Sequence, residues 1–161
     1  LYHNPLTGQF NYIPYDVDNT WGIDWLDRNW SDRNVYTWSQ TGQPRPLFNR
    51  LMDIDSFRDI FSWHLQDMLN SSFSDPAYQE YIQNLQNFIT EAALIDPYRP
   101  LDFGYSEEDF LNSLDEPWGG HVDFSIFDFM NLREESANNQ LEFVNIPPIL
   151  VSVKKDFHFR Q

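Results

Sequence analysis

Cysteine is absent from this sequence, and basic residues are few. Ten Lys and Arg stand against 25 Asp and Glu, which gives a formal net charge of −15 at pH 7. A surface with this charge repels the phosphates of nucleic acids and of anionic membranes, so we expect neither as a partner. Without cysteine no disulfide framework forms, an absence that neither requires nor excludes export.

Long apolar runs and glycine-rich loops are also missing. No apolar run is long enough to span a bilayer, so the sequence predicts no membrane insertion. Glycine accounts for six of 161 residues, and the only lysines are Lys154 and Lys155. The sequence therefore shows no glycine-rich loop of the kind that cradles nucleotide phosphates beside a lysine.

Aromatic residues, in contrast, are abundant. Fourteen Phe, eight Tyr and six Trp make up 17% of the chain, and hydrophobic residues make up 41%. A chain of this length and composition has enough apolar material to bury a core. We therefore predict one globular unit and not a disordered tail.

Apolar residues recur at helical spacing in the middle of the chain. After Asp55, an expected N-cap, this spacing predicts a helix with a buried stripe made of Phe57, Ile60, Phe61, Leu65, Met68 and Leu69. A second helix is predicted from Asp75 and Pro76, with the stripe Tyr78, Tyr81, Ile82, Leu85, Phe88 and Ile89. His64 lies next to the first stripe, and we expect a core or boundary histidine there and not a catalytic one.

Two further helices and one irregular segment are predicted. A short helix follows Ser106 through Phe110 and Leu114, and another runs from about Asp123 to Asn138. The segment 25–38 carries Trp25, Trp30 and Trp38 without a clean period, which predicts a loop. Its tryptophans either pin the loop onto the helical core or approach a ligand, and aromatic burial favours the first interpretation.

Both ends of the chain are predicted to be extended. Residues 1–3 and 10–15 alternate in hydrophobicity and flank a turn at 4–8, which predicts a β-hairpin. Strands are also expected at 141–144 and 149–153, so that the tail is either a linker to a following domain or a strand that closes on the hairpin. The predicted fold class is α+β and mostly α, with an N-terminal hairpin and C-terminal strands.

Two aspartates one residue apart follow the first strand-like run. Asp16 and Asp18 leave the end of that run on the same side, and a cation between them removes their mutual repulsion. With Asn19 as a neutral oxygen ligand and no Cys or His nearby, the set favours Mg²⁺, Mn²⁺ or Ca²⁺ over zinc. A turn rich in Asp and Asn without any metal accounts for the same residues.

The block 13–22 resembles a signature of the CotH kinases, a family of atypical protein kinases named after spore coat protein H. In that signature a proline and two spaced aspartates precede a glycine, and here these residues are Pro14, Asp16, Asp18 and Gly22. The runs 45–52, 57–61 and 65–69 are similar to a later segment of the family, and 127–133 is similar to its late helix. Together the resemblance covers about residues 1–142.

The resemblance implies the helical C-terminal part of an atypical protein kinase, which transfers the γ-phosphate of ATP to Ser or Thr of coat or surface proteins. Asp16, Asp18 and Asn19 are then the ligands of the Mg²⁺ or Mn²⁺ that bridges the ATP phosphates. The nucleotide-clamping lobe and the catalytic residues are expected upstream, so this fragment alone is expected to be inactive. Residues 1–140 form the kinase-like part and 141–161 the tail. A location in the spore coat, at the cell surface or outside the cell is implied by the resemblance alone.

A calcium-binding module and a purely structural coat or surface protein are the alternatives. The oxygen-bearing residues that approach the ligand spacing of an EF-hand loop are Asp16, Asp18, Thr20, Asp24 and Asp27. Trp21 stands where that loop needs glycine, and the last ligand is Asp in place of the bidentate Glu.

One further motif spells the metal-binding triplet of ordinary protein kinases, at Asp102, Phe103 and Gly104. No activation-loop ending or His-Arg-Asp segment accompanies it, and a capped helix is predicted to begin at once after it, at Ser106. We therefore discount this triplet as a functional site.

Overall fold

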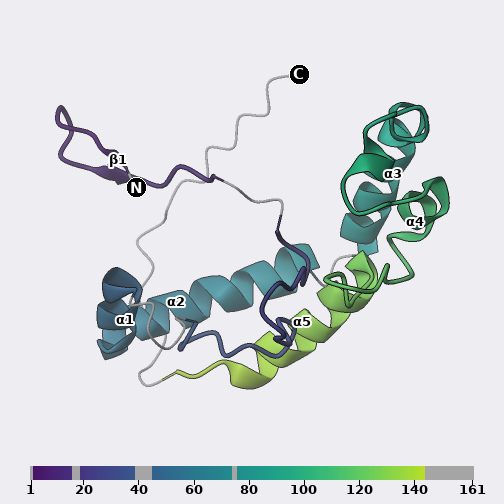
Figure 1. The fold of residues 1–161 in the computed structure, drawn as a ribbon. Helices are drawn as coiled ribbons and strands as arrows, with labels where there is room; N and C mark the ends of the chain where they lie inside the picture. The colour runs from purple at the N-terminus through teal and green to yellow at the C-terminus, as the bar shows by residue number, and fades with distance from the viewer. Residues whose placement is uncertain (1, 16–18, 39–44, 74–75, 144–161) are drawn as a thin grey trace. The chain divides into compact units, whose positions relative to one another are not determined.

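The computed structural model describes all residues except 1, 16–18, 39–44, 74–75 and 144–161. The fold is mostly helical, with one short hairpin near the N-terminus (Figure 1), which confirms the predicted class. The chain divides into two compact units, Leu1–Asp32 with Gln79–Arg133 and Arg33–Tyr78 with Glu134–Gln161, where the composition predicted one globular unit. Within the described ranges, no helix is long and apolar enough to cross a membrane.

The first unit begins with the hairpin. Strands β1 (Tyr2–His3) and β2 (Phe10–Asn11) pair antiparallel, with Tyr2 opposite Asn11. The backbone N–H of Gly8, whose φ is +69°, donates to the carbonyl of Asn4 at 2.9 Å and closes the turn. The hairpin was predicted, but β2 ends at Asn11, short of residue 15, in keeping with Pro14, which has no N–H to donate to a ladder.

Helix α3 (Pro76–Leu94) begins at the predicted proline, but its apolar stripe is not a core face. No residue of α3 that the structure describes is buried. Exposed fractions are 54% for Tyr81, 45% for Leu85, 86% for Phe88 and 49% for Ile89. The spacing predicted the helix correctly, while Tyr78 and Ile82 are only partly buried and the other four members of the stripe are exposed.

A one-turn helix η2 (Arg99–Leu101) and the short helix α4 (Glu107–Asn112) follow. The predicted start of α4 is confirmed in detail. Ser106 and Asp109 form a capping box, in which the N–H of Asp109 donates to Ser106 Oγ at 3.1 Å and the N–H of Ser106 donates to Asp109 Oδ2 at 2.7 Å. These two bonds use backbone donors that the first turn of a helix leaves without partners.

Helix α5 (Ile126–Gln140) begins three residues later than predicted. The cause is Ser125, which is 1% exposed and whose Oγ accepts a hydrogen bond from the N–H of Asp128 at 3.1 Å. Ser125 therefore acts as the N-cap, and Asp123 lies outside the helix. After α5, residues 141–143 form no strand. The remainder of the predicted C-terminal strands, from 144 on, lies outside the described residues.

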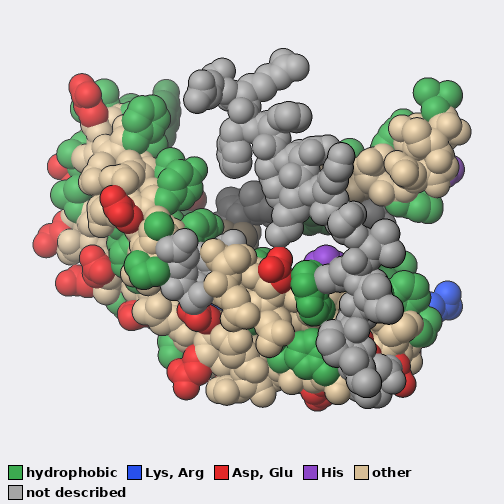
Figure 2. All heavy atoms as spheres, turned by 180° about the vertical axis from the view of Figure 1, so that it is seen from behind, with side chains coloured by type: hydrophobic (Ala, Val, Ile, Leu, Met, Phe, Trp, Pro, Cys, Tyr) green, Lys and Arg blue, Asp and Glu red, His purple; other side chains and the backbone are tan. Residues whose placement is uncertain are grey.

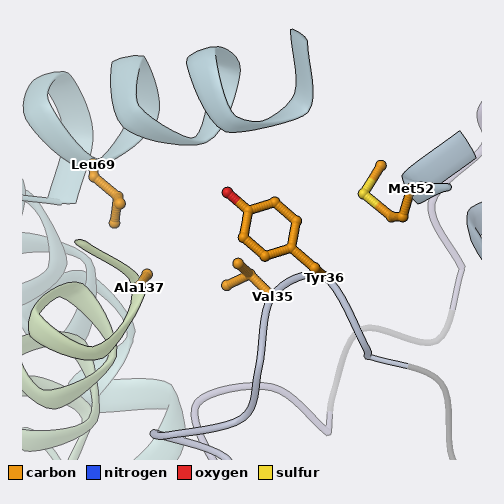
Figure 3. Packing of buried hydrophobic residues seen from close by; sticks show 5 residues of the cluster. All are labelled: Val35, Tyr36, Met52, Leu69 and Ala137. Atoms are coloured by element: carbon orange, nitrogen blue, oxygen red, sulfur yellow. The ribbon is translucent and has the colours of Figure 1, made fainter. Parts of the chain in front are cut away.

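The second unit contains α1 (Pro46–Met52), α2 (Asp55–Met68) and the short π-helix η1 (Leu69–Phe73). Its core joins Val35 and Tyr36 from the loop to Met52, Leu69 and Ala137, whose side chains converge in Figure 3. Phe61 and Leu65 of α2 pack against this cluster. The unit thus buries a loop segment among helices.

Three details of the predicted α2 are wrong. Asp55 lies in the first turn, and Ile54 occupies the N-cap without a side-chain hydrogen bond. Phe57, Ile60 and Met68 of the predicted stripe are exposed, while the polar residues Asp59 and Ser62 are buried. His64 is exposed as well and meets Trp63 edge-on, with ring centroids 5.1 Å apart. The buried Ser62 bonds to Tyr36, as described below.

Candidate metal turn and the loop that follows it

Of the three predicted metal ligands, the structure places Asn19. Its side chain is exposed, and its Oδ1 accepts a hydrogen bond from Trp25 Nε1 at 2.9 Å. An amide oxygen has two lone pairs, so this bond leaves one free for a cation. Asp16 and Asp18 lie outside the described residues.

The chain after Asn19 makes a tight left-handed bend. Trp21 and Gly22 have φ angles of 59° and 82°. A Cβ added at Gly22 would lie 2.5 Å from Phe129 Cδ2 and 2.9 Å from Phe124 Cδ2. Glycine is therefore required here by backbone conformation and by packing together, and the bend sits directly on the aromatic residues at the start of α5.

Asp24 organises the loop that follows. It is 8% exposed, and its Oδ1 accepts from the N–H of Leu26 and from Trp30 Nε1, both at 2.9 Å. Its Oδ2 accepts from the N–H of Arg28 at 2.7 Å. Burial acts to raise the pKa of Asp24, but the hydrogen bonds from Arg28, Leu26 and Trp30 outweigh it and hold that pKa below the ordinary value. The carboxylate therefore stays charged as the anchor of an irregular loop.

His121 fastens this loop to the segment before α5. Its ring stacks on Trp25 with centroids 3.9 Å apart and an interplanar angle of 17°. Its carbonyl accepts the N–H of Asp24 at 2.7 Å, and its Nε2 lies 2.9 Å from the Tyr105 hydroxyl. Burial, followed by the charges of Asp102 and Asp109, raises the pKa of Tyr105, which therefore remains a neutral phenol.

No pattern in the sequence indicated a role for His121, and the structure shows several partners. The residues that connect to it lie about 20 and 100 positions away in the sequence, at Tyr105, Phe103 and Trp25. Phe103, the middle residue of the discounted triplet, meets the His121 ring edge-on at 4.6 Å. Phe103 is thus part of an aromatic cluster with His121.

A small apolar pocket lies beside the bend. Its volume is about 320 Å³, and its lining includes Thr20, Trp21, Phe110, Trp118 and Phe124. This volume falls at the lower end of the range for sites that take small organic groups.

Arg99, Asp109 and Glu116 form the charged part of the lining of this pocket. Arg99 Nε is buried and makes no hydrogen bond to any described residue, while the guanidinium donates to the carbonyl of Ala93 and lies 3.9 Å from Glu107. Hydrogen bonds from Ser106, then one from Trp118 and the charge of Arg99, lower the pKa of Asp109 against a smaller effect of burial. The otherwise apolar lining therefore carries one guanidinium and two carboxyl groups.

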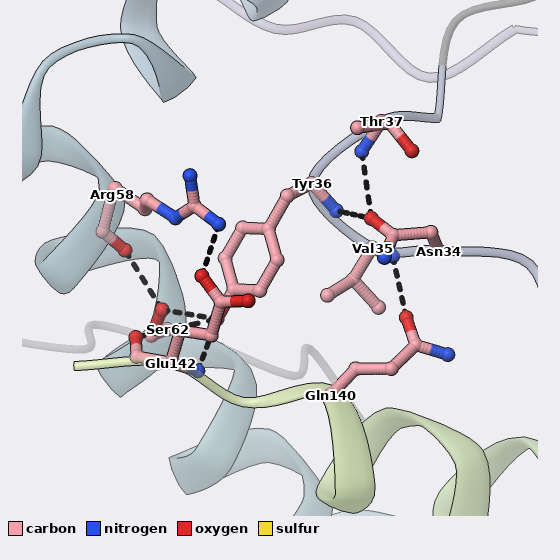
Figure 4. Close-up of polar contacts among 8 residues, drawn as sticks. All are labelled: Asn34, Val35, Tyr36, Thr37, Arg58, Ser62, Gln140 and Glu142. Carbon is pink, nitrogen blue, oxygen red and sulfur yellow. Dashed lines mark hydrogen bonds and ion pairs between the residues drawn. The ribbon is translucent and has the colours of Figure 1, made fainter.

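The segment 25–38 is a loop, as predicted, and Tyr36 ties its second half down. The Tyr36 hydroxyl lies 2.6 Å from Ser62 Oγ and accepts from the N–H of Glu142 at 2.8 Å (Figure 4). Arg58 pairs with Glu142 and lies over the Tyr36 ring, 4.3 Å from its centroid. Trp25 and Trp38 are 54% and 42% exposed, so Val35 and Tyr36 pin this loop more firmly than those two tryptophans do.

A second, polar pocket of about 580 Å³ borders this network, with Asn34, Tyr36, Asn49, Asp53 and Arg58 in its lining. No pattern in the sequence indicated it. Among the residues that the structure describes, no three or more His, Cys, Asp or Glu side chains gather as a metal site. Acidic side chains are nevertheless spread over the face drawn in Figure 2, where basic ones are scarce.

These features define the class of the protein, which is a mostly helical domain with a short hairpin and a tightly anchored acidic bend. The family model described as "CotH kinase protein" matches residues 1–136. The chain therefore belongs to the CotH kinase protein family, which confirms the resemblance.

One curated relative is a spore coat protein. The chain is 29% identical to "Inner spore coat protein H" of Bacillus subtilis (strain 168) over 102 residues, which are 63% of this chain. The chain spans only 27% of the length of that relative. No solved structure matches the chain.

Proposed function

We propose that this chain is the metal-holding part of a CotH-type protein kinase, which transfers the γ-phosphate of ATP to Ser or Thr of coat or surface proteins. The observation that carries the proposal is the family match over residues 1–136, because it includes the turn with Asp16, Asp18 and Asn19. These residues would bind Mg²⁺ or Mn²⁺, and the metal, when bound, neutralises charge on the phosphates during transfer. The name of the curated relative supports a place in the spore coat.

The geometry around Asn19 supports this assignment. The bend at Trp21 and Gly22 is packed onto Phe124 and Phe129, and Asp24 anchors the following loop through three hydrogen bonds. A ligand-bearing turn needs such support, since charged ligands are effective when their backbone is held in place before the ligand arrives. The chain carries no glycine-rich loop, so the phosphate clamp and the group that orients the hydroxyl are assigned to the rest of the protein.

A calcium-binding module is the second candidate, and the backbone of Trp21 is the observation that favours it. An EF-hand loop needs a left-handed residue at its sixth position, and Trp21, the sixth residue from Asp16, has a φ of 59°. Asp24 argues against this candidate. Both lone pairs of its Oδ1 are used by Leu26 and Trp30, and its Oδ2 accepts from Arg28.

The test is transfer of labelled γ-phosphate from ATP to Ser and Thr, with Mg²⁺ or Mn²⁺ and the full-length protein that contains this chain. We expect transfer by the wild type and its loss in Asp16→Ala and in Asp18→Ala, because each change removes a carboxylate from the metal. Asp123→Ala, at an exposed aspartate, is the matched control and should keep wild-type activity. Retained transfer in both aspartate variants would contradict the metal assignment.

Measurements on the same full-length protein also distinguish the calcium-binding candidate from the kinase. Absence of transfer with either metal, together with a rise in melting temperature on adding Ca²⁺ that Asp16→Ala abolishes, would replace the kinase proposal by the calcium-binding one.

A further inference from the structure

We propose that Trp25 and His121 are positioning residues for the metal turn: the indole N–H of Trp25 fixes the Asn19 amide, and His121 holds the indole in place. This inference rests on the proposed function, because it gives Asn19 the role of a metal ligand. Its basis is a continuous series of contacts from Asn19 to Trp25, His121 and Tyr105 within one compact unit.

The first contact fixes the orientation of the amide. Trp25 Nε1 donates to Asn19 Oδ1 at 2.9 Å, across six positions of sequence. The indole has no acceptor atom, so this bond identifies Oδ1 as the oxygen and prevents the amide from rotating its NH₂ group toward Trp25. A hydrogen bond from a neighbouring donor to a ligand atom is the usual way in which proteins orient metal ligands.

The second contact fixes the indole. The His121 ring stacks on it at 3.9 Å, and Phe103 packs against it with ring centroids 5.3 Å apart. The His121 backbone is held in turn, because its carbonyl accepts from the N–H of Asp24 at 2.7 Å. The Tyr105 hydroxyl, 2.9 Å from His121 Nε2, limits rotation of the imidazole.

Packing alone does not account for the position of Trp25. The side chain remains 54% exposed, so its burial contributes little compared with that of a core tryptophan. Its N–H nevertheless points to the one predicted ligand that the structure describes. This combination of an exposed ring with a directed polar edge fits a positioning role.

The experiment measures Mn²⁺ binding to the full-length protein by electron paramagnetic resonance, without ATP. Trp25→Phe keeps an aromatic ring for stacking and removes the N–H. We expect its Mn²⁺ affinity to fall about three- to tenfold, the factor that one hydrogen bond of ordinary strength supplies. Asn19→Ala should cause a comparable or larger fall, and Trp25→Phe should add nothing in the Asn19→Ala background.

Two further variants separate positioning from stability. His121→Ala should lower Mn²⁺ affinity, and His121→Phe, which restores a ring for stacking, should recover most of it. Trp38→Phe is the control, since Trp38 is similarly exposed, at 42%, and lies in the other compact unit. In a transfer assay Trp25→Phe should raise the apparent KM for the metal more than it lowers kcat.

Each outcome bears on one proposal or on both. Wild-type Mn²⁺ affinity in Trp25→Phe would overturn the positioning role and leave the kinase proposal intact, whereas wild-type affinity in Asn19→Ala would remove Asn19 from the ligands and with it this inference. If Trp25→Phe lowers Mn²⁺ affinity by the same factor in the wild type and in the Asn19→Ala background, the positioning role is overturned as well. Absence of Mn²⁺ binding by the wild type would overturn the proposed function along with this inference.

Discussion

Gly22 is the residue at which backbone conformation and packing act together beside the candidate metal turn. Gly22→Ala should cost about 1–2 kcal/mol for the left-handed backbone and about 1–3 kcal/mol more for the forced contact with Phe129 and Phe124. Gly8→Ala is the control, because its φ is +69° but a Cβ there meets nothing within 4 Å, so only the first cost applies. The free energy of unfolding, measured in urea, provides the comparison. Equal losses at the two positions would show that Phe129 yields to the new methyl group.

Asp24 should make stability depend on pH in one direction. Its hydrogen bonds lower its pKa in the folded protein below the ordinary value of 3.8. The stabilisation is then complete above the unfolded-state pKa and is lost as the pH falls through the folded-state pKa. Asp24→Asn should therefore destabilise the protein at pH 7, by about 1–3 kcal/mol, and the gap to the wild type should narrow below about pH 4.

Melting temperature measured from pH 7 to pH 3 tests this expectation, with Asp123→Asn at an exposed position as the control. A gap that stays constant down to pH 3 would mean that charge on Asp24 contributes nothing.

Residue roles were only partly predictable. Asn19 was identified as a candidate ligand because it follows two spaced aspartates, a local pattern. The role of His121 depends on Trp25 and Tyr105, which lie far away in the sequence, so no local pattern indicated it. Asp24 was considered as a calcium ligand, whereas in the structure it anchors the loop by accepting hydrogen bonds from nearby backbone N–H groups. Aspartate commonly bonds to the N–H two residues further on in turns, so the sequence carries no specific signal for this role.

At the scale of elements, the buried face of α2 includes a polar residue that takes part in a tertiary hydrogen bond. Ser62 is fully buried, donates to the carbonyl of Arg58 at 2.9 Å and lies 2.6 Å from the Tyr36 hydroxyl. The periodicity of α2 predicted its existence and length well, since both are local properties. It did not predict the burial of Ser62, because the partner of that side chain, Tyr36, comes from a loop outside the helix.

Tyr36→Phe tests how much the hydrogen bonds of the Tyr36 hydroxyl contribute to stability. It leaves the N–H of Glu142 without its acceptor and removes one partner of Ser62, so we expect a loss of about 1–3 kcal/mol in the free energy of unfolding. Ser62→Ala should add less in the Tyr36→Phe background than in the wild type, since the two hydroxyls share a bond. Tyr98→Phe, at a residue that is 74% exposed, is the control and should be neutral. Fully additive losses would contradict a direct coupling.

At the scale of the whole molecule, the sequence predicted the mostly helical class and the family, because motif order and helix periodicity can be recognised without knowing which residues are in contact. It did not predict how apolar surface is distributed. Four of the six apolar residues in the stripe of α3 are exposed in a chain that spans 27% of the length of its curated relative. Which apolar faces are buried depends on everything that surrounds them, and that information is not contained in the period of one helix.

The contact between Trp25 and His121 gives this protein a native optical reporter. An indole that is half open to water changes its emission when its hydrogen bond or its stacking partner changes, and this indole touches both Asn19 and an imidazole. Events at the acidic turn are therefore expected to register as a change in tryptophan fluorescence without any attached dye. Substitution of the other tryptophans by Phe would isolate the emission of Trp25, so that its fluorescence alone reports changes at the acidic turn.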